Sequence, residues 1–313
     1  KPKEISFPYP IASSESLTDN TYLSYNTVVG NVLDKELYLA FEVLEYALLN
    51  APGAPLKKAL IDAGIGKDIM GSYDNGIYQP IFSIIAKNAN EEQKEEFLSV
   101  IRNVLEDCVK NGISKKSLLA GINSMEFKFR EADFGAYPKG LMYGLQCLDS
   151  WIYDEKEPFM HIEAIETYAF LKEQTKGRYF EELVQKYLLD NTHVSVVITK
   201  PQKGLNAENE KALEEKLAAY KAMLSKEEID SLIADTRHLK EYQEEPSPKE
   251  DLEKIPLLKR EDLKKDIVKL TNEECEVAGV PALYHDVFTS GIHYVDFLSL
   301  IHISEPTRLR CIS

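Results

Sequence analysis

The segment Ile122-Asn-Ser-Met-Glu-Phe-Lys-Phe-Arg-Glu131 lies at the centre of the most informative part of this sequence, and Tyr137-Pro-Lys-Gly-Leu141 and Trp151-Ile-Tyr-Asp154 follow it. Within and just before this segment, apolar side chains recur at helical spacing at Leu118, Ile122, Met125 and Phe129. Such spacing predicts a helix from Ser114 to about Arg130 with one face turned towards a core.

Similar helical patterns recur along the first 200 residues, and short runs of β-branched and aromatic residues separate some of them. The patterns predict helices over residues 34–50, 56–63, 90–111, 138–150, 159–173 and 177–189, and strands over 22–29, 77–86 and 193–199. Asp34 is a candidate N-cap and Gly112 a candidate stop signal. We therefore expect the α+β class, with a layer of long amphipathic helices on a mostly antiparallel sheet.

The composition changes after Pro201. Residues 206–243 are dominated by Glu, Lys, Ala and Leu, and they predict two helices that form a helical hairpin, with a capping box from Ser225 to Glu228. Residues 244–258 contain three prolines and predict an irregular connector. A β-hairpin is expected further on, with strands over 282–288 and 292–298 around the turn Thr289-Ser-Gly291.

These patterns predict a domain organisation. We expect an α+β domain over residues 1–201, a helical-hairpin linker and proline-rich connector over 202–258, and the incomplete start of a further domain over 259–298. Residues 299–313 resemble translated sequencing-adapter read-through and are given no functional weight. Lys1 is not an initiator Met and no apolar signal-peptide core follows it, so the start of the protein is expected upstream.

The charge and composition disfavour several functions. A formal net charge of −15 argues against binding to nucleic acids, which requires Lys and Arg to neutralise phosphates, and against docking on an anionic membrane. No run of about 18 apolar residues predicts a transmembrane helix. The four cysteines are far apart and form no C-x-x-C pair, which is typical of reduced thiols in a cytoplasm.

The order of several segments resembles the presequence-protease branch of the insulinase/pitrilysin zinc metallopeptidases. The matching segments are the three quoted above together with Pro55-Leu-Lys-Lys-Ala-Leu-Ile-Asp-Ala-Gly64, Ile255-Pro-Leu-Leu258 and His285-Asp-Val-Phe-Thr-Ser-Gly-Ile-His-Tyr294. The resemblance covers roughly residues 1–298. It implies that this chain is a fragment spanning the second domain, the helical-hairpin linker and the start of the third domain.

The resemblance also implies a function. In that family four homologous α+β domains form two halves that close around a chamber for unfolded peptides, and zinc is held by an H-x-x-E-H motif in the first domain. This motif does not occur between Lys1 and Ser313. We therefore expect no catalytic residue and no metal ligand in this chain, with zinc as cofactor only in the parent protein. The expected partners are peptide substrates and the other domains of the same polypeptide.

Three residues are candidates for contact with peptides. Arg130 and Lys139 lie in the family-like segments. Tyr78 lies with Tyr73 and Phe82 in the segment that is expected to pair as strands, and one of these three could line the floor of the chamber. His238-Leu-Lys-Glu-Tyr242 approaches the zinc motif but has Tyr in place of the second His, so a solvated helix face is expected there. Cys108 lies on an apolar helix stripe and is expected in the core.

The sequence therefore predicts an inactive fragment of a cytoplasmic zinc metalloendopeptidase that forms a chamber wall and a tether between the halves. Two alternatives stay open. One is a non-catalytic, peptide-binding homologue of the same family. The other is an unrelated acidic α+β interaction protein. Whether the chain counts as an enzyme is undecided, because its parent is expected to be one while the chain itself lacks the motif.

Overall fold

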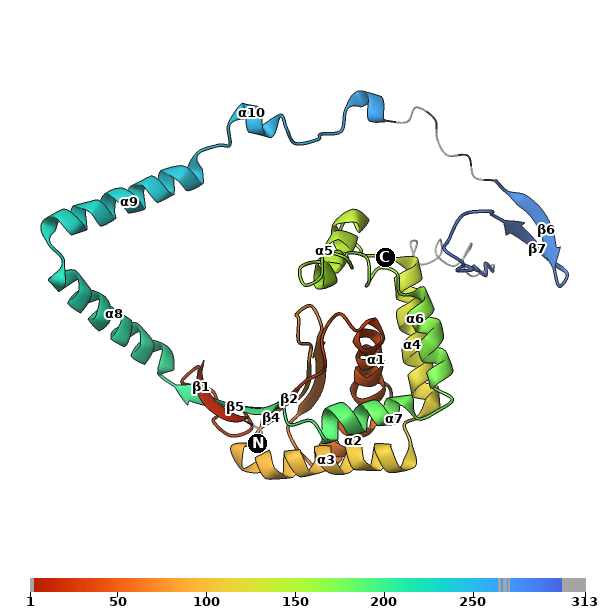
Figure 1. Ribbon diagram of the computed structural model, residues 1–313, viewed down its shortest axis with the longest axis horizontal. Coiled ribbons are helices and arrows are strands. Elements are labelled where there is room, and N and C mark those ends of the chain that lie inside the picture. The colour runs from red at the N-terminus through yellow and green to blue at the C-terminus, as the bar shows by residue number, and fades with distance from the viewer. Residues whose placement is uncertain (1–2, 264–265, 267–268, 270, 300–313) are drawn as a thin grey trace, which may run out of the picture. The chain divides into compact units, whose positions relative to one another are not determined.

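A computed structural model describes residues 3–263, 266, 269 and 271–299 (Figure 1). The chain divides into two units, one formed by residues 1–204 with 289–313 and the other by residues 205–288. The predicted artefact over 299–313 lies outside the described residues except for Ser299. The finer predicted boundaries at 201, 258 and 298 stay predictions.

The first unit is built on a five-stranded sheet. Its strands are β1 (Lys3–Ile11), β2 (Thr21–Val28), β3 (Asp68–Asp74), β4 (Ile81–Ala89) and β5 (Val194–Lys203), in the order β1-β5-β2-β4-β3. The pairings β5–β2, β2–β4 and β4–β3 are antiparallel, whereas β1 and β5 are parallel. The prediction of a mostly antiparallel sheet is therefore confirmed.

Two strands were not predicted, and both lie at the edges of the sheet. Ile5, Phe7, Tyr9 and Ile11 alternate along β1, but Pro8 and Pro10 lie between them and disfavour a strand, and all residues of β1 are exposed or half-buried. Proline is tolerated there because an edge strand leaves one row of N–H positions without a partner. β3 carries charged ends and Gly71 in its middle, which weaken the strand signal. β4 begins at Ile81 rather than at the predicted residue 77.

The helices follow the predicted stripes and caps closely. They are α1 (Lys35–Glu45), α2 (Pro55–Asp62), α3 (Lys94–Asn111), α4 (Lys115–Glu131), α5 (Lys139–Trp151), α6 (Ile165–Gln174) and α7 (Tyr179–Val184). π-helical turns extend α1 over Tyr46–Asn50 and α7 over Gln185–Leu189. The side chain of Asp34 accepts a hydrogen bond from the backbone N–H of Leu37 at 3.0 Å, and Gly112 ends α3 at φ +93°. Both predicted signals are confirmed.

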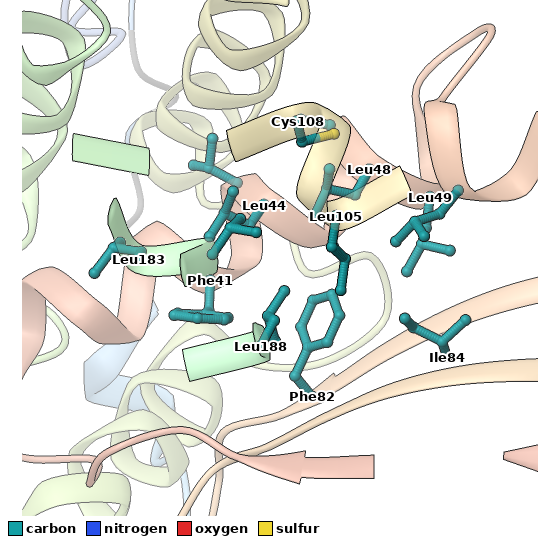
Figure 2. Close-up of a cluster of buried hydrophobic side chains, with 14 of the residues drawn as sticks. Phe41, Leu44, Leu48, Leu49, Phe82, Ile84, Leu105, Cys108, Leu183 and Leu188 are labelled. Carbon is teal, nitrogen blue, oxygen red and sulfur yellow. The ribbon is translucent and has the colours of Figure 1, made fainter. Parts of the chain in front are cut away.

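The core lies between one face of the sheet and the helices (Figure 2). Phe41 and Leu44 of α1 are fully buried, as are Leu48 of the following π-helical turn and Phe82 and Ile84 of β4. The rings of Phe41 and Phe82 meet edge to face, with 5.8 Å between their centroids. Side chains of α3 and α7 complete the cluster, and these include Leu105, Cys108 and Leu183. The buried position predicted for Cys108 is confirmed, and burial raises the pKa of its thiol to about 11.

The turn from α2 into β3 depends on Gly66. Its φ is +66°, and a Cβ built there would lie 2.6 Å from the backbone carbonyl oxygen of Lys87. We expect Gly66→Ala to lower the free energy of unfolding by about 3 kcal/mol, because a left-handed conformation costs roughly 1–2 kcal/mol for alanine and the backbone of β4 must also shift. Urea denaturation followed by circular dichroism measures this loss.

Gly64 provides the matched control. Its φ is +69°, but a Cβ at this position would have no atom within 4 Å. Gly64→Ala is therefore expected to cost only the conformational part, about 1 kcal/mol. Equal losses in the two variants would contradict the close approach of β4 to Gly66.

The second unit contains two long helices and a small hairpin. α8 (Leu205–Met223) and α9 (Lys226–Glu244) are followed by α10 (Lys249–Leu252), β6 (Glu273–Val277) and β7 (Val280–Tyr284). The predicted capping box between Ser225 and Glu228 is confirmed, with both of its hydrogen bonds present. No residue of α8 or α9 is buried, and their apolar side chains line a groove of about 620 Å³ beside the junction of the two helices.

The predicted position of the β-hairpin is wrong. The hairpin spans Glu273 to Tyr284 and turns at Ala278 and Gly279, both of which have positive φ. The predicted turn exists, since the N–H of Ile292 donates to the carbonyl of Thr289 at 3.0 Å, but residues 282–288 and 292–298 form no ladder with each other, and residues 282–284 pair with β6 instead. An alternating pattern gives a strand only where a partner strand is available.

No helix in the part of the chain that the structure describes is both long enough and apolar enough to cross a membrane.

Candidate peptide-facing site

Arg130 lies in the last turn of α4, where an acidic partner holds it. Its Nη2 lies 2.7 Å from Oε1 of Glu126, one helical turn earlier, and Lys172 of α6 contacts the other carboxylate oxygen of Glu126. Burial opposes ionisation of Glu126, but the hydrogen bonds from Lys172 and Arg130 outweigh it and lower the pKa of this carboxyl group. Arg130 therefore helps to join α4 to α6.

Lys139 is the first residue of α5 and is exposed to solvent. Its Nζ donates a 3.5 Å hydrogen bond to the backbone carbonyl of Glu131, so Lys139 and Arg130 lie near the same end of α4. The hydroxyl of Tyr294 donates to Oε1 of Glu131 at 3.0 Å. The structure thus brings two of the three candidate residues together.

Tyr78 belongs to a different region, the loop that connects β3 to β4. It is 48% exposed, and its ring centroid lies 5.1 Å from that of Tyr153, just after α5. Phe82 is fully buried in the core and so cannot line a chamber. Among the three predicted aromatic residues, Tyr78 alone presents a largely exposed ring.

A cluster of polar side chains that the sequence analysis missed lies near Tyr78, and we call it the acidic cluster. It contains Tyr38 and Glu42 of α1, Tyr73 of β3, Asn75 of the β3–β4 loop, Asp149 of α5, and His161. The hydroxyl of Tyr38 donates to Oδ2 of Asp149 at 3.2 Å, and Nδ2 of Asn75 donates to Oε1 of Glu42 at 2.9 Å. Tyr38 and Asp149 are 111 positions apart in the chain, so no sequence spacing could reveal the cluster.

The carboxyl groups of the acidic cluster are difficult to ionise. Burial raises the pKa of Glu42 to about 7, and the charges of Glu45 and Asp149 add to this effect although Asn75 opposes it. Burial also raises the pKa of Asp149. At neutral pH, Glu42 is therefore close to the midpoint of its titration, which is a frequent property of functional sites.

His161 packs against Tyr38 of the acidic cluster. Its ring stacks on that of Tyr38, with 4.0 Å between centroids and an interplanar angle of 26°. The side chain is buried, and burial lowers the pKa of this imidazole to about 4, so it is neutral at physiological pH. Its Nε2 is buried without a hydrogen-bond partner, as is the hydroxyl of Tyr73.

α5, the helix that contains Asp149, carries an exposed apolar stripe. The stripe recurs every third or fourth residue, and each of its side chains is largely exposed: Leu141, Leu145, Leu148 and Trp151. Asp149 lies on the same helix and faces Tyr38. α5 therefore contributes both an apolar surface and a carboxylate to this side of the unit.

The described residues contain no group of three or more His, Cys, Asp or Glu side chains that could hold a metal ion. In particular, His238 and Glu241 lie on α9, none of whose residues is buried. The expectation of a solvated helix face at residues 238–242 is confirmed. The His, Cys, Asp and Glu side chains of the described residues therefore do not fit a zinc site.

Two family models match the chain. Residues 2–125 match the inactive domain of peptidase family M16, and residues 199–309 match the region described as associated with the C subfamily of M16 peptidases. The chain belongs to the M16 peptidase family. The resemblance to insulinase/pitrilysin peptidases is thereby confirmed, and the α+β unit corresponds to a domain of the inactive type.

Two curated relatives align with nearly the whole chain. It is 44% identical over 295 residues to protein HypA of Clostridium perfringens, and the match covers 94% of this chain and 30% of that protein. It is 30% identical over 294 residues to presequence protease 1, chloroplastic/mitochondrial, of Arabidopsis thaliana, where the match covers 92% of this chain and 27% of that protein. The chain thus spans less than a third of the length of each of these relatives.

A solved structure of a peptidase M16 inactive domain from Pseudomonas fluorescens also aligns with this chain. The alignment covers 64% of this chain and 44% of the other, at 14% sequence identity and a TM-score of 0.43.

Proposed function

We propose that this chain forms a non-catalytic wall of the peptide chamber in a zinc metalloendopeptidase, and that the zinc site lies in another domain of the same polypeptide. The observation that carries the proposal is the match of residues 2–125 to the M16 inactive domain. The similarity to a presequence protease along 92% of the chain supports a peptide or protein substrate. The second unit, with α8 and α9, would serve as the tether between the two halves.

Within this proposal, Tyr78, Arg130 and Lys139 contact peptide. Tyr78 has the strongest support, because its side chain is half-exposed and its ring packs against Tyr153, just after α5 with its apolar stripe. Lys139 is exposed and could pair with a peptide carboxylate. Arg130 already pairs with Glu126, so its contribution would be to hold the end of α4 in place.

The cytoplasm is the proposed location. It is supported by Cys108, Cys147 and Cys275, which are all free thiols in the structure. Disulfide-free cysteines are typical of reducing compartments.

The proposal is tested by comparing the purified chain with the longer polypeptide expected to contain it. With zinc and an unfolded fluorogenic peptide, the chain alone is expected to cause no hydrolysis. The longer protein is expected to carry H-x-x-E-H upstream and to cleave the same peptide until a chelator removes the metal. Chelator-sensitive hydrolysis by residues 1–313, or a longer protein without that motif, would contradict the proposal.

A further inference from the structure

The second unit carries an apolar groove on its surface, which we call the hairpin groove. It lies where α8 ends and α9 begins, has a volume of about 620 Å³, and is lined by apolar side chains from both helices and the turn between them: Leu217, Tyr220, Leu224, Ile229, Leu232 and Ile233. Leu224 and Ile229 are half-buried, whereas the other four side chains are between 46% and 54% exposed. An apolar concavity of this size, within the roughly 300–1,000 Å³ range of ligand pockets, is a candidate binding surface.

The spacing of the apolar side chains indicates the shape of a partner. The stripe advances by four, three and four positions on α8 and by three, four and three positions on α9: Leu213, Leu217, Tyr220 and Leu224, then Ile229, Leu232, Thr236 and Leu239. The hydroxyl of Thr236 donates to the carbonyl of Leu232 at 2.7 Å, so it needs no partner from outside. Alternating steps of three and four are typical of helices that pack against another helix, yet no residue of α8 or α9 is buried. The groove therefore suits a helix with a matching apolar stripe.

The charges that line the hairpin groove are all positive. They belong to Lys221 of α8 and to Arg237 and Lys240 of α9. Residues 205–244 contain six Lys or Arg and ten Asp or Glu, so the groove has three of the six cations and none of the ten acidic residues. The three form no ion pair with a described residue, whereas Lys211, which does not line the groove, lies 3.9 Å from Glu215. A basic apolar surface in a chain of formal net charge −15 favours an acidic partner.

The same charges disfavour other occupants. A second copy of this chain that docked through its own hairpin groove would bring three cations against three cations, and like charges facing one another are repulsive. An anionic membrane surface would meet the remainder of a strongly acidic chain. A helix with Asp or Glu beside its apolar stripe matches both the shape and the charge of the groove.

We propose that the hairpin groove binds an acidic amphipathic helix of a separate polypeptide. The apolar stripe of that helix would pack on the apolar side chains of the groove, and its carboxylates would pair with Lys221, Arg237 and Lys240. Exposed ion pairs each add little affinity, but they select the partner and its orientation. The proposal is independent of the chamber role, because it uses no residue of the first unit.

The test is fluorescence anisotropy with the whole chain and three labelled helical peptides. Two of them share a leucine stripe with steps of three and four and carry either glutamate or lysine beside it, and the third keeps the glutamates but has serine in place of leucine. We expect the glutamate–leucine peptide to bind at least roughly tenfold more tightly than either of the other two. Its affinity should fall as salt is added, because salt screens exposed charges.

Charge reversal in the groove should reverse the preference between the two leucine peptides. Lys221→Glu combined with Lys240→Glu is expected to bind the lysine peptide more tightly than the glutamate peptide. The matched control is Lys211→Glu combined with Lys216→Glu, which changes the net charge equally at two exposed positions of α8 that do not line the groove. This control should keep the preference of the wild type. Circular dichroism of both double variants excludes loss of helix as the cause.

Three results would overturn the proposal while leaving the proposed function standing. The first is equal affinity for the glutamate and lysine peptides, or equal effects of the two double variants. The second is binding to vesicles that contain phosphatidylserine without binding to the glutamate peptide. The third is binding of the glutamate peptide to this chain but not to the longer polypeptide expected to contain it, since another part of the same polypeptide would then occupy the groove.

Discussion

Replacing Phe82 with alanine is expected to lower the free energy of unfolding by about 3–5 kcal/mol, the usual range for removing a large aromatic side chain from a packed core. Phe82 is fully buried and contacts the ring of Phe41 edge to face. Its removal leaves a cavity where β4 meets α1 and α3, and those elements cannot move inward without breaking other contacts (Figure 2). Urea denaturation followed by far-ultraviolet circular dichroism measures the change.

Phe127 on α4 serves as the control for this prediction. Its side chain is 45% exposed, so Phe127→Ala should change the free energy of unfolding by no more than about 0.5–1 kcal/mol. If the two variants lost similar amounts of stability, the core would not be where the structure places it.

Replacing Glu42 with glutamine should change how stability depends on pH. The pKa of Glu42 rises from its ordinary value of 4.5 to about 7 on folding, so its protonated form is preferred in the folded state. The resulting stabilisation is fully present below about pH 4.5 and is lost as the pH rises through about 7. Glutamine cannot ionise, so Glu42→Gln should gain about 1–3 kcal/mol relative to the wild type between about pH 4.5 and about pH 8.

The measurement is a pair of urea denaturation curves for each protein, one at each pH. Asp149 and Glu45 also have raised pKa values, but both proteins contain them, so the difference between the two proteins reports Glu42 together with its coupling to these two carboxyl groups. If the stability of the two proteins changed in parallel with pH, Glu42 would not be held in a half-buried, unpaired state.

The sequence predicted the helices well because their information is local. The stripe of α4 and the caps at Asp34 and Ser225 are each encoded within a few residues, and all are present. The edge strand β1 was missed because Pro8 and Pro10 interrupt its alternating pattern, and β3 was missed because its charged ends and Gly71 weaken the strand signal. The β-hairpin was misplaced because residues 273–284 and 282–298 both alternate, and only long-range pairing decides which segment forms the ladder.

The candidate site was only partly predictable. The family-like segments drew attention to Arg130 and Lys139, and Tyr78 was found as an aromatic residue near a predicted strand. Glu42, Asp149 and His161 gave no signal, because each falls within an ordinary helical or loop pattern and they meet only in the folded unit. Glu42 and Asp149 are half-buried without a cationic partner among the described residues, and this is a property of the tertiary structure.

The most direct test of the peptide-facing role is photochemical cross-linking in the longer polypeptide that we propose contains this chain. Photoreactive p-benzoylphenylalanine would replace Tyr78 in one variant and Ile61 of α2 in another, because both side chains are 48% exposed. After irradiation with a labelled unfolded peptide, a covalent adduct is expected from position 78 and not from position 61. Equal labelling at the two positions, or none at position 78 while the peptide is being cleaved, would contradict the account.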